Sequence, residues 1–198
     1  MPKLWNATIE SHRALVRDAI LDATVALVAE RGLLGVTMAD IAGRAGIGRA
    51  TLYKYFADAE SILHAWHERE IGGHLAEVAA IAEGPGDGVA RLAAVLERYA
   101  INAHAGHGGH GADLAAFLHR DGQVVAAQHR LRSLVADLIA EAAAAGAVRS
   151  DIAADELAAY CLAALSAATE LRSAAAVRRL VRLTLAGVSP DAASRTPA

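Results

Sequence analysis

The sequence predicts an all-α protein, with a three-helix N-terminal domain followed by a larger helical domain and about nine helices in all. Its 198 residues are 55% hydrophobic, but only 4% are aromatic, and alanine is the commonest apolar residue. Alanine loses no side-chain entropy in a helix and lets helices approach closely, which favours helices over strands. Apolar residues also recur at helical spacing between segments rich in glycine and proline.

The first helix is predicted to run from Ser11 to Arg31. Ile20 and Leu27 belong to an apolar set with helical spacing, as on one buried face. Gly32 follows directly, where a helix commonly ends on a residue with left-handed backbone. A short connector, residues 33–36, then leads to the next segment.

Two short helices are predicted next, over Met38–Ala45 and Gly48–Phe56. The hydroxyl of Thr37 can cap the first of them, and Asp40 stands where the reciprocal partner of a capping box belongs. Gly46 lies between the two helices, where a tight turn needs a positive φ. This arrangement is typical of a helix-turn-helix.

A long helix is predicted from Ala59 to Glu83, with Asp58 as its N-cap. The glycines and proline of residues 84–88 (GPGDG) end it. A glycine-rich loop is expected at residues 104–111. Five further helices are predicted: Val89–Ala105, Asp113–Arg120, Gln123–Ala145, Ala154–Ser173 and Ala174–Gly187.

Charge and cysteine content describe the chain as a whole. Residues 1–57 hold seven Lys or Arg and five Asp or Glu, a net charge of +2; since the chain carries −3, the remainder carries −5. A mildly basic head on an acidic body is compatible with DNA binding by the head. No apolar run reaches the length of a membrane span, and no leader precedes the first helix. The single cysteine fits a reducing compartment, so a cytoplasmic location without membrane contact is expected.

The second short helix has a solvent face suited to DNA. Leu52 and Phe56 are expected in the core. Hydroxyls, small side chains and cations on the other face suit the major groove, where base edges and phosphates lie close together. The residues left to solvent are Arg49, Ala50, Thr51, Tyr53, Lys54 and Tyr55. Arg13 and Arg17 of the first helix are interpreted as solvated surface charge, with contact to DNA phosphates as the alternative.

Four short patterns occur in order along the first 65 or so residues: Ile20-x-x-Ala23 and Leu27 before Gly32, Thr37 ahead of Ile41-Ala42, Ala45-Gly46-Ile47, and Thr51-Leu52-Tyr53 before Phe56. With these patterns the sequence resembles the TetR family of transcriptional repressors. The resemblance implies that Thr37, Tyr53 and Lys54 hold phosphates, while Arg49, Ala50, Thr51 and Tyr55 lie near bases. Two positions depart from the family: Gly48 replaces the common Ser or Thr cap, and Ala59 replaces a lysine.

The resemblance also implies two domains with different functions. Residues 1–58 are expected to form the helix-turn-helix DNA-binding domain, and 59–190 a helical domain for effector binding and dimerisation. Within the latter, 59–83 is the connecting helix, and 191–198 is expected to be a flexible tail. Candidate contacts for an unidentified small-molecule effector are the polar or aromatic residues among the alanines: Trp66, His74, Tyr99, Asn102, Phe117, His119, Tyr160, Cys161 and Thr169.

Dimerisation is predicted from two apolar stripes near the C-terminus. Two helices with small and aliphatic faces can pack against their symmetry mates as a four-helix bundle. Such a homodimer would present two recognition helices to a palindromic operator on double-stranded DNA. The alternative is that both stripes pack inside one chain. The stripes consist of Leu157, Ala164, Leu165 and Ala168, and of Val177, Leu180, Val181 and Leu185.

The sequence was also searched by residue type for signs of metal binding and catalysis, and the histidines give the first of these. Histidines spaced by two residues at 104, 107 and 110, and His64 with His67 on one helical face, suggest a metal site. Loop glycines raise the cost of ordering such a site, so no metal and no cofactor is predicted. The chain has no phosphate loop or nucleophile elbow, so it is not expected to be an enzyme. The main alternative is a helical small-molecule or metal-binding protein with weak or no specific DNA binding.

Overall fold

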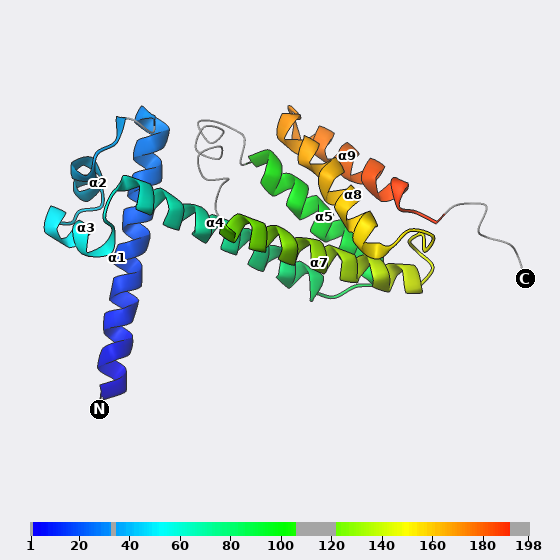
Figure 1. The fold of residues 1–198 in the computed structure, drawn as a ribbon, viewed down its shortest axis with the longest axis horizontal. Coiled ribbons are helices and arrows are strands. Elements are labelled where there is room, and N and C mark those ends of the chain that lie inside the picture. The colour runs from blue at the N-terminus through cyan, green and yellow to red at the C-terminus, as the bar shows by residue number, and fades with distance from the viewer. Residues whose placement is uncertain (1, 33–34, 106–121, 191–198) are drawn as a thin grey trace, which may run out of the picture. The chain divides into compact units, whose positions relative to one another are not determined.

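The computed structural model describes residues 2–32, 35–105 and 122–190, and throughout these ranges the only regular elements are helices (Figure 1). The predicted all-α class is confirmed. The predicted helix at 113–120 and the tail from 191 lie outside the described residues. The elements are α1 (Pro2–Arg31), α2 (Met38–Arg44), α3 (Arg49–Tyr55), α4 (Ala59–Ala82), α5 (Gly88–Ala105), α7 (Gly122–Ala144), α8 (Ala154–Ser166), the 3₁₀ helix η2 (Ala167–Glu170) and α9 (Ala174–Gly187).

The described chain divides into two compact units. Unit 1 takes in the residues up to Glu70, and unit 2 begins at Ile71. The division therefore falls inside α4 and not at residue 58, where the sequence suggested it. Ile62 and Ala65 of the first half of α4 are buried in the core of unit 1, which explains why this half belongs there. Gly72 and Gly73 follow the division directly.

The core of unit 1 is built from the apolar faces of α1, α2, α3 and the start of α4. Thr24 is also buried, and its hydroxyl donates to the Ile20 carbonyl at 2.8 Å, which satisfies a polar group that would otherwise be costly to bury. This shared core fixes α3 against α1 and α2. Its buried members are Ile20, Leu21, Leu27, Ile41, Ala42, Leu52, Phe56, Ile62 and Ala65.

The first helix is longer than expected. It begins at Pro2, although Ser11 was predicted to start it. Proline suits the first helical position, where its missing N–H has no intrahelical partner, and neither glycine nor proline interrupts the residues that follow. Ser11 is an interior residue of α1, not a cap. The helix ends as predicted, with Gly32 at φ 76°.

Unit 2 is organised around α5. This helix packs against α7, α8 and α9, and its buried residues include Leu92, Val95 and Leu96 (Figure 1). Asp87 caps it, accepting a hydrogen bond from the Ala90 amide at 2.8 Å. α7 ends at Ala144, and Gly146, which has φ 72°, lies in the turn that follows it. The bounds of α5, α7 and α9 lie within one residue of the predicted ones.

The eighth helix is shorter than predicted. Ala154–Ser173 was expected to be one helix, but α8 ends at Ser166 and η2 follows it. Two side-chain hydroxyls compete for backbone carbonyls here: Ser166 Oγ donates to the Ala163 oxygen at 2.7 Å, and Thr169 Oγ1 to the Ser166 oxygen at 2.9 Å. Such local bonds favour a tighter turn over continued α-helix. Ser173 then caps α9.

None of the described helices is both long enough and apolar enough to cross a membrane.

Candidate nucleic-acid interface

The start of α2 is fixed by a capping box. Asp40 N donates to Thr37 Oγ1 at 3.3 Å, and Thr37 N donates to Asp40 Oδ2 at 3.1 Å, as the sequence predicted. The Thr37 hydroxyl also donates to the same carboxylate. Hydrogen bonds from Thr37, together with the Arg31 guanidinium, lower the pKa of Asp40. The hydroxyl proton of Thr37 is thus used inside the box.

The turn between α2 and α3 is a Schellman motif around Gly46. Ile47 N donates to the Ala42 carbonyl at 3.0 Å, and Gly46 N donates to the Gly43 carbonyl at 3.3 Å. Gly46 has φ 68°, which confirms the positive φ expected there. Ile47 packs against the core of unit 1. The angle at which α3 leaves α2 is therefore set by local hydrogen bonds and by burial.

Helix α3 has one buried anchor and a broad exposed face. Leu52 is fully buried, while Tyr53 is 57% exposed. Gly48 occupies the N-cap in an extended conformation and offers no side-chain hydrogen bond. Of the predicted DNA contacts, Arg49, Ala50, Tyr53 and Lys54 are exposed, Thr51 is half-buried, and Tyr55 packs partly against the core of unit 1.

Ion pairs sort the cations of unit 1 into two groups. Arg44 binds Glu30 at 2.7 Å, and Arg31 binds Asp40 at 3.3 Å. The hydrogen bond from Arg44 lowers the pKa of Glu30. Among the cations whose side chains the structure describes in this unit, those without a carboxylate partner are Arg13, Arg17, Arg49 and Lys54.

A branched ion pair fastens α4 to α1. Arg69 Nη1 lies 3.2 Å from Asp18 Oδ1, and Arg69 Nη2 lies 2.5 Å from Asp22 Oδ1. Burial opposes the charge of Arg69, but the hydrogen bonds that it donates to Asp22 and Asp18 outweigh this effect and raise the pKa of the guanidinium. Sequence reasoning missed this contact, because 47 residues separate Arg69 from Asp22.

The described candidate effector residues do not converge on one cavity. Cys161 is fully buried in the core of unit 2, where burial raises the pKa of its thiol to about 11. Burial also raises the pKa of Tyr99, which packs against the same core. Trp66 packs in unit 1, and Tyr160 is 47% exposed. Thr169 donates to Ser166, His74 is exposed, and Phe117 and His119 lie outside the described residues.

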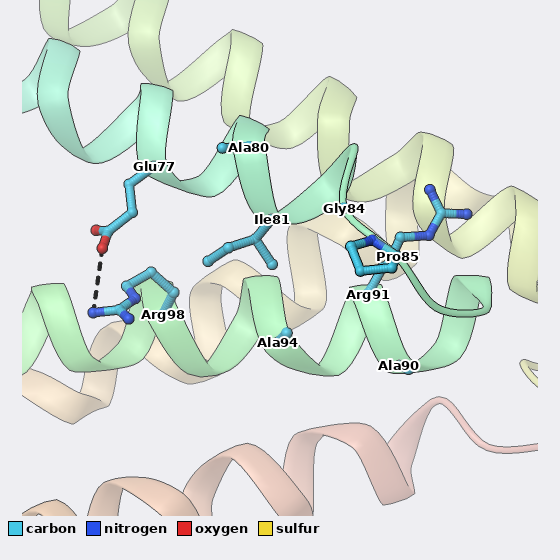
Figure 2. Close-up of a pocket in the computed structure, with 9 residues that line it drawn as sticks. All are labelled: Glu77, Ala80, Ile81, Gly84, Pro85, Ala90, Arg91, Ala94 and Arg98. Carbon is cyan, nitrogen blue, oxygen red and sulfur yellow. Dashed lines mark ion pairs between the residues drawn. The ribbon is translucent and has the colours of Figure 1, made fainter.

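A groove of about 470 Å³ runs between the second half of α4 and α5 (Figure 2). Three of its nine lining residues are alanines, and Arg98 Nη1 pairs with Glu77 Oε1 across it at 3.3 Å. Asn102, one of the predicted effector contacts, donates to the other oxygen of Glu77 at 3.4 Å but does not line the groove. The groove residues are Glu77, Ala80, Ile81, Gly84, Pro85, Ala90, Arg91, Ala94 and Arg98.

The predicted dimer stripes are largely internal. Five of their residues are buried within a single chain, so a second copy cannot reach them, and the interior alternative holds for these five. Ala164, Leu180 and Leu185 are half-buried. The reason is that α8 and α9 each turn their most apolar stripe toward α5. The five buried residues are Leu157, Leu165, Ala168, Val177 and Val181.

Histidines were the candidates for a metal site. His104 Nδ1 lies 3.2 Å from the Ala168 carbonyl, a contact inside unit 2. His107 and His110 fall outside the described residues. Within the described ranges, no group of three or more His, Cys, Asp or Glu side chains is placed to hold a metal ion.

Two family descriptions match the chain in succession. Residues 20–66 match the bacterial regulatory proteins of the tetR family. Residues 90–190 match the C-terminal domain of SbtR-like transcriptional regulators. The first match covers the helix-turn-helix, and the second covers most of unit 2.

Individual proteins agree with these matches. The HTH-type transcriptional regulator AlkX of Mycobacterium tuberculosis is 40% identical over 53 residues, which are 27% of this chain and 25% of AlkX, so the match spans a quarter of that relative. A TetR/AcrR-family regulator from Thermobifida fusca YX-ER1 has a TM-score of 0.75 and 24% identity, covering 86% of this chain and 97% of the other. FadR from Bacillus subtilis, solved with stearoyl-CoA, has a TM-score of 0.65 and 17% identity, covering 86% and 98%. The two structures show a shared fold.

Proposed function

This chain belongs to the TetR family of bacterial regulatory proteins, and we propose that it acts as a repressor that binds a palindromic operator as a dimer. The observation that supports this role is the exposed face of α3. Arg49, Tyr53 and Lys54 project from a helix whose position is fixed by the buried Leu52 and the Gly46 turn. Cations and a phenol on one short helix can meet phosphates and base edges in a major groove.

Roles are assigned residue by residue. Tyr53 and Lys54 bind phosphates, and Arg49 reaches a base edge from the first turn of α3, with Ala50 and Thr51 beside it. To Thr37 we assign the capping of α2, because its hydroxyl already donates to Asp40. Tyr55 is the least exposed of the aromatic candidates on α3 and contributes mainly by packing.

The dimer is assigned to the outer faces of α8 and α9. Tyr160 on α8 is 47% exposed and Leu183 on α9 is 69% exposed, although both are large and apolar enough to favour burial. The two helices pack closely, since a Cβ at Gly187 would lie 2.7 Å from Tyr160 Oη. A two-fold axis at this surface would let the two copies of unit 1 bind the two half-sites of a palindromic operator.

Release from DNA is assigned to a small-molecule effector bound in unit 2. The fold relative FadR was solved with stearoyl-CoA, which supports an organic ligand as the effector class. A ligand changes DNA affinity only if it binds one conformation better than another. The groove beside the second half of α4 offers such a place, because a ligand there would compete with the Glu77–Arg98 pair. Operator binding places the protein in the cytoplasm.

The first prediction concerns Arg49 and Tyr53. Fluorescence anisotropy with DNA from beside the protein's own gene is expected to show specific binding at low salt. Tyr53→Ala should weaken binding to all sequences, because a phosphate contact reads no base. Arg49→Ala should cost about 1–3 kcal/mol on the operator and also relax the preference between operators.

Two results would overturn these assignments. No specific binding by the folded dimer at low salt would remove the repressor role and favour a small-molecule or metal-binding protein. Equal losses from both variants on every DNA would show that Arg49 does not read bases. Arg130→Ala, which removes an exposed cation of α7 in unit 2, is the control for net charge.

A further inference from the structure

Arg17 of α1 is held against the end of the recognition helix. Its guanidinium carbon lies 4.9 Å from the centroid of the Phe56 ring, a cation–π contact. Phe56 is the C-cap of α3 and is only 6% exposed, so the ring is a rigid platform. The cation of α1 is thereby placed next to the last turn of α3, which carries Lys54.

Arg13 extends this charge along α1. It lies one helical turn before Arg17 on the same face, about 6 Å along the axis. Because α1 begins at Pro2, Arg13 sits well inside a helix and not in a frayed end. The N-terminal half of α1 runs on past α2 and α3 (Figure 1). Glu10, three residues before Arg13, is the acidic residue on this face.

Three other carboxylates of α1 are bound to other cations. Asp18 and Asp22 bind Arg69, and Glu30 binds Arg44. Within the described residues neither Arg13 nor Arg17 has an ion-pair partner, and both are exposed. Two guanidinium groups one turn apart on α1, one of them stacked on the C-cap of α3, match the chemistry of a phosphate backbone.

We infer that Arg13 and Arg17 form a second DNA-contacting surface, which binds backbone phosphates flanking the bases read by α3. The inference rests on the proposed function and extends it from α3 to α1. Stacking on Phe56 holds the Arg17 guanidinium in place before DNA arrives, so less side-chain entropy is lost on binding. Phosphate contacts fix register without reading sequence, so this surface adds affinity and not base preference.

The test is the salt dependence of operator binding by the full-length protein. Anisotropy titrations over a range of salt concentrations compare wild type with Arg17→Ala, Arg17→Lys and Arg130→Ala. Each lost phosphate contact lowers the slope of log affinity against log salt by about 0.9, so the Arg17→Ala dimer should lose about 1.8. Arg17→Lys keeps the charge and should restore most of the slope. Arg130→Ala should retain the wild-type slope.

Specific and non-specific DNA should lose affinity equally in Arg17→Ala, and Glu10→Gln should bind both more tightly. If wild type binds its operator and Arg17→Ala keeps the full slope, the second surface does not exist. If Arg17→Lys is as weak as Arg17→Ala and both melt earlier, Arg17 only supports the fold, which also overturns the inference. Failure of wild type to bind any operator would instead count against the proposed function.

Discussion

At the residue scale, pairing matters more than the number of charges. The chain carries −3, which does not indicate a nucleic-acid binder. In unit 1, however, Arg31, Arg44 and Arg69 are each neutralised by a carboxylate. Arg49 and Lys54, on the exposed face of α3, have no carboxylate partner among the described residues. A cation without a nearby carboxylate attracts phosphate more strongly, because close opposite charges largely cancel its field.

Acid should destabilise unit 1 partly through Asp40. Its pKa is lowered in the folded state, so the carboxylate adds stability above its unfolded pKa, and this is lost as pH falls through the folded value. Asp40→Asn should therefore show a smaller fall in Tm than wild type between about pH 5 and pH 2. Tryptophan fluorescence measures the unfolding of unit 1 at each pH, since both tryptophans, Trp5 and Trp66, belong to that unit.

Glu30→Gln is the matched comparison, because the pKa of Glu30 is lowered by its hydrogen bond with Arg44 and not by the capping box. Glu30→Gln should also reduce the fall in Tm at acid pH. Its effect should add to that of Asp40→Asn, because the two carboxylates bind different arginines. If Tm falls equally with pH in wild type and in Asp40→Asn, the Thr37–Asp40 capping box does not contribute to acid sensitivity.

Single residues were predictable where their partners are local. Thr37 and Asp40 are three residues apart, so their bond follows from the sequence. Leu157 and Val177 were placed on the wrong surface, because an apolar stripe does not say whether it faces its own chain or a second copy. The Arg69 contacts depend on the path of the whole chain, and no local signal reveals them.

At the element scale, helix ends followed their capping signals. α2, α3, α5 and α9 begin and end within one residue of the predicted positions. The errors have specific causes. The first helix was predicted to begin at Ser11 but begins at Pro2, and the hydroxyls of Ser166 and Thr169 shorten α8. A serine signals a helix end only when the backbone around it leaves the helix.

The two glycines of the helix-turn-helix should respond to substitution in opposite ways. Gly48 has φ −71° and room for a side chain, so Gly48→Ser should add a cap to α3 and stabilise unit 1 by about 0.5–1 kcal/mol. Gly46 has φ 68°, so Gly46→Ala should cost about 1–2 kcal/mol although no atom blocks the new methyl. Urea denaturation followed by tryptophan fluorescence measures both changes.

Gly43→Ala serves as the reference, since Gly43 lies within α2 with a helical backbone and open space around it. It should raise stability through helix propensity alone, by up to about 1 kcal/mol. A Gly46→Ala protein as stable as wild type would show that the turn does not need its left-handed residue.

At the scale of the whole molecule, the sequence predicts two functional parts that meet at residue 58, and the two compact units divide further along the chain. The division lies inside α4, because Ile62 and Ala65 join the core of unit 1. Ala80, Ala90 and Ala94 are three of the nine residues that line the groove between α4 and α5, and other alanines are buried in the core of unit 2. Alanines that line a groove cannot be told from alanines in a core until the helices are placed.

The dimer surface can be tested at Leu183. This side chain is 69% exposed, so Leu183→Glu should leave the fold of one chain intact. If the outer faces of α8 and α9 pair, a buried carboxylate there should produce monomers and weaken operator binding. Size-exclusion chromatography with light scattering gives the mass of the species in solution.

Val125→Glu is the control, because Val125 is also apolar and 53% exposed but belongs to α7. It should leave the mass unchanged. A Leu183→Glu protein that keeps the mass and the operator affinity of wild type would move the dimer surface away from α9.

Helix α4 contains two adjacent glycines, Gly72 and Gly73. Both lie inside the helix, directly after the point where the two units divide, and no atom lies close enough to exclude a Cβ. Packing therefore does not require glycine, yet each one lowers helix stability by about 1 kcal/mol relative to alanine. Helix propensity within α4 is therefore weak close to the division between the two units, so local unwinding of α4 should cost less there than in its alanine-rich last turns.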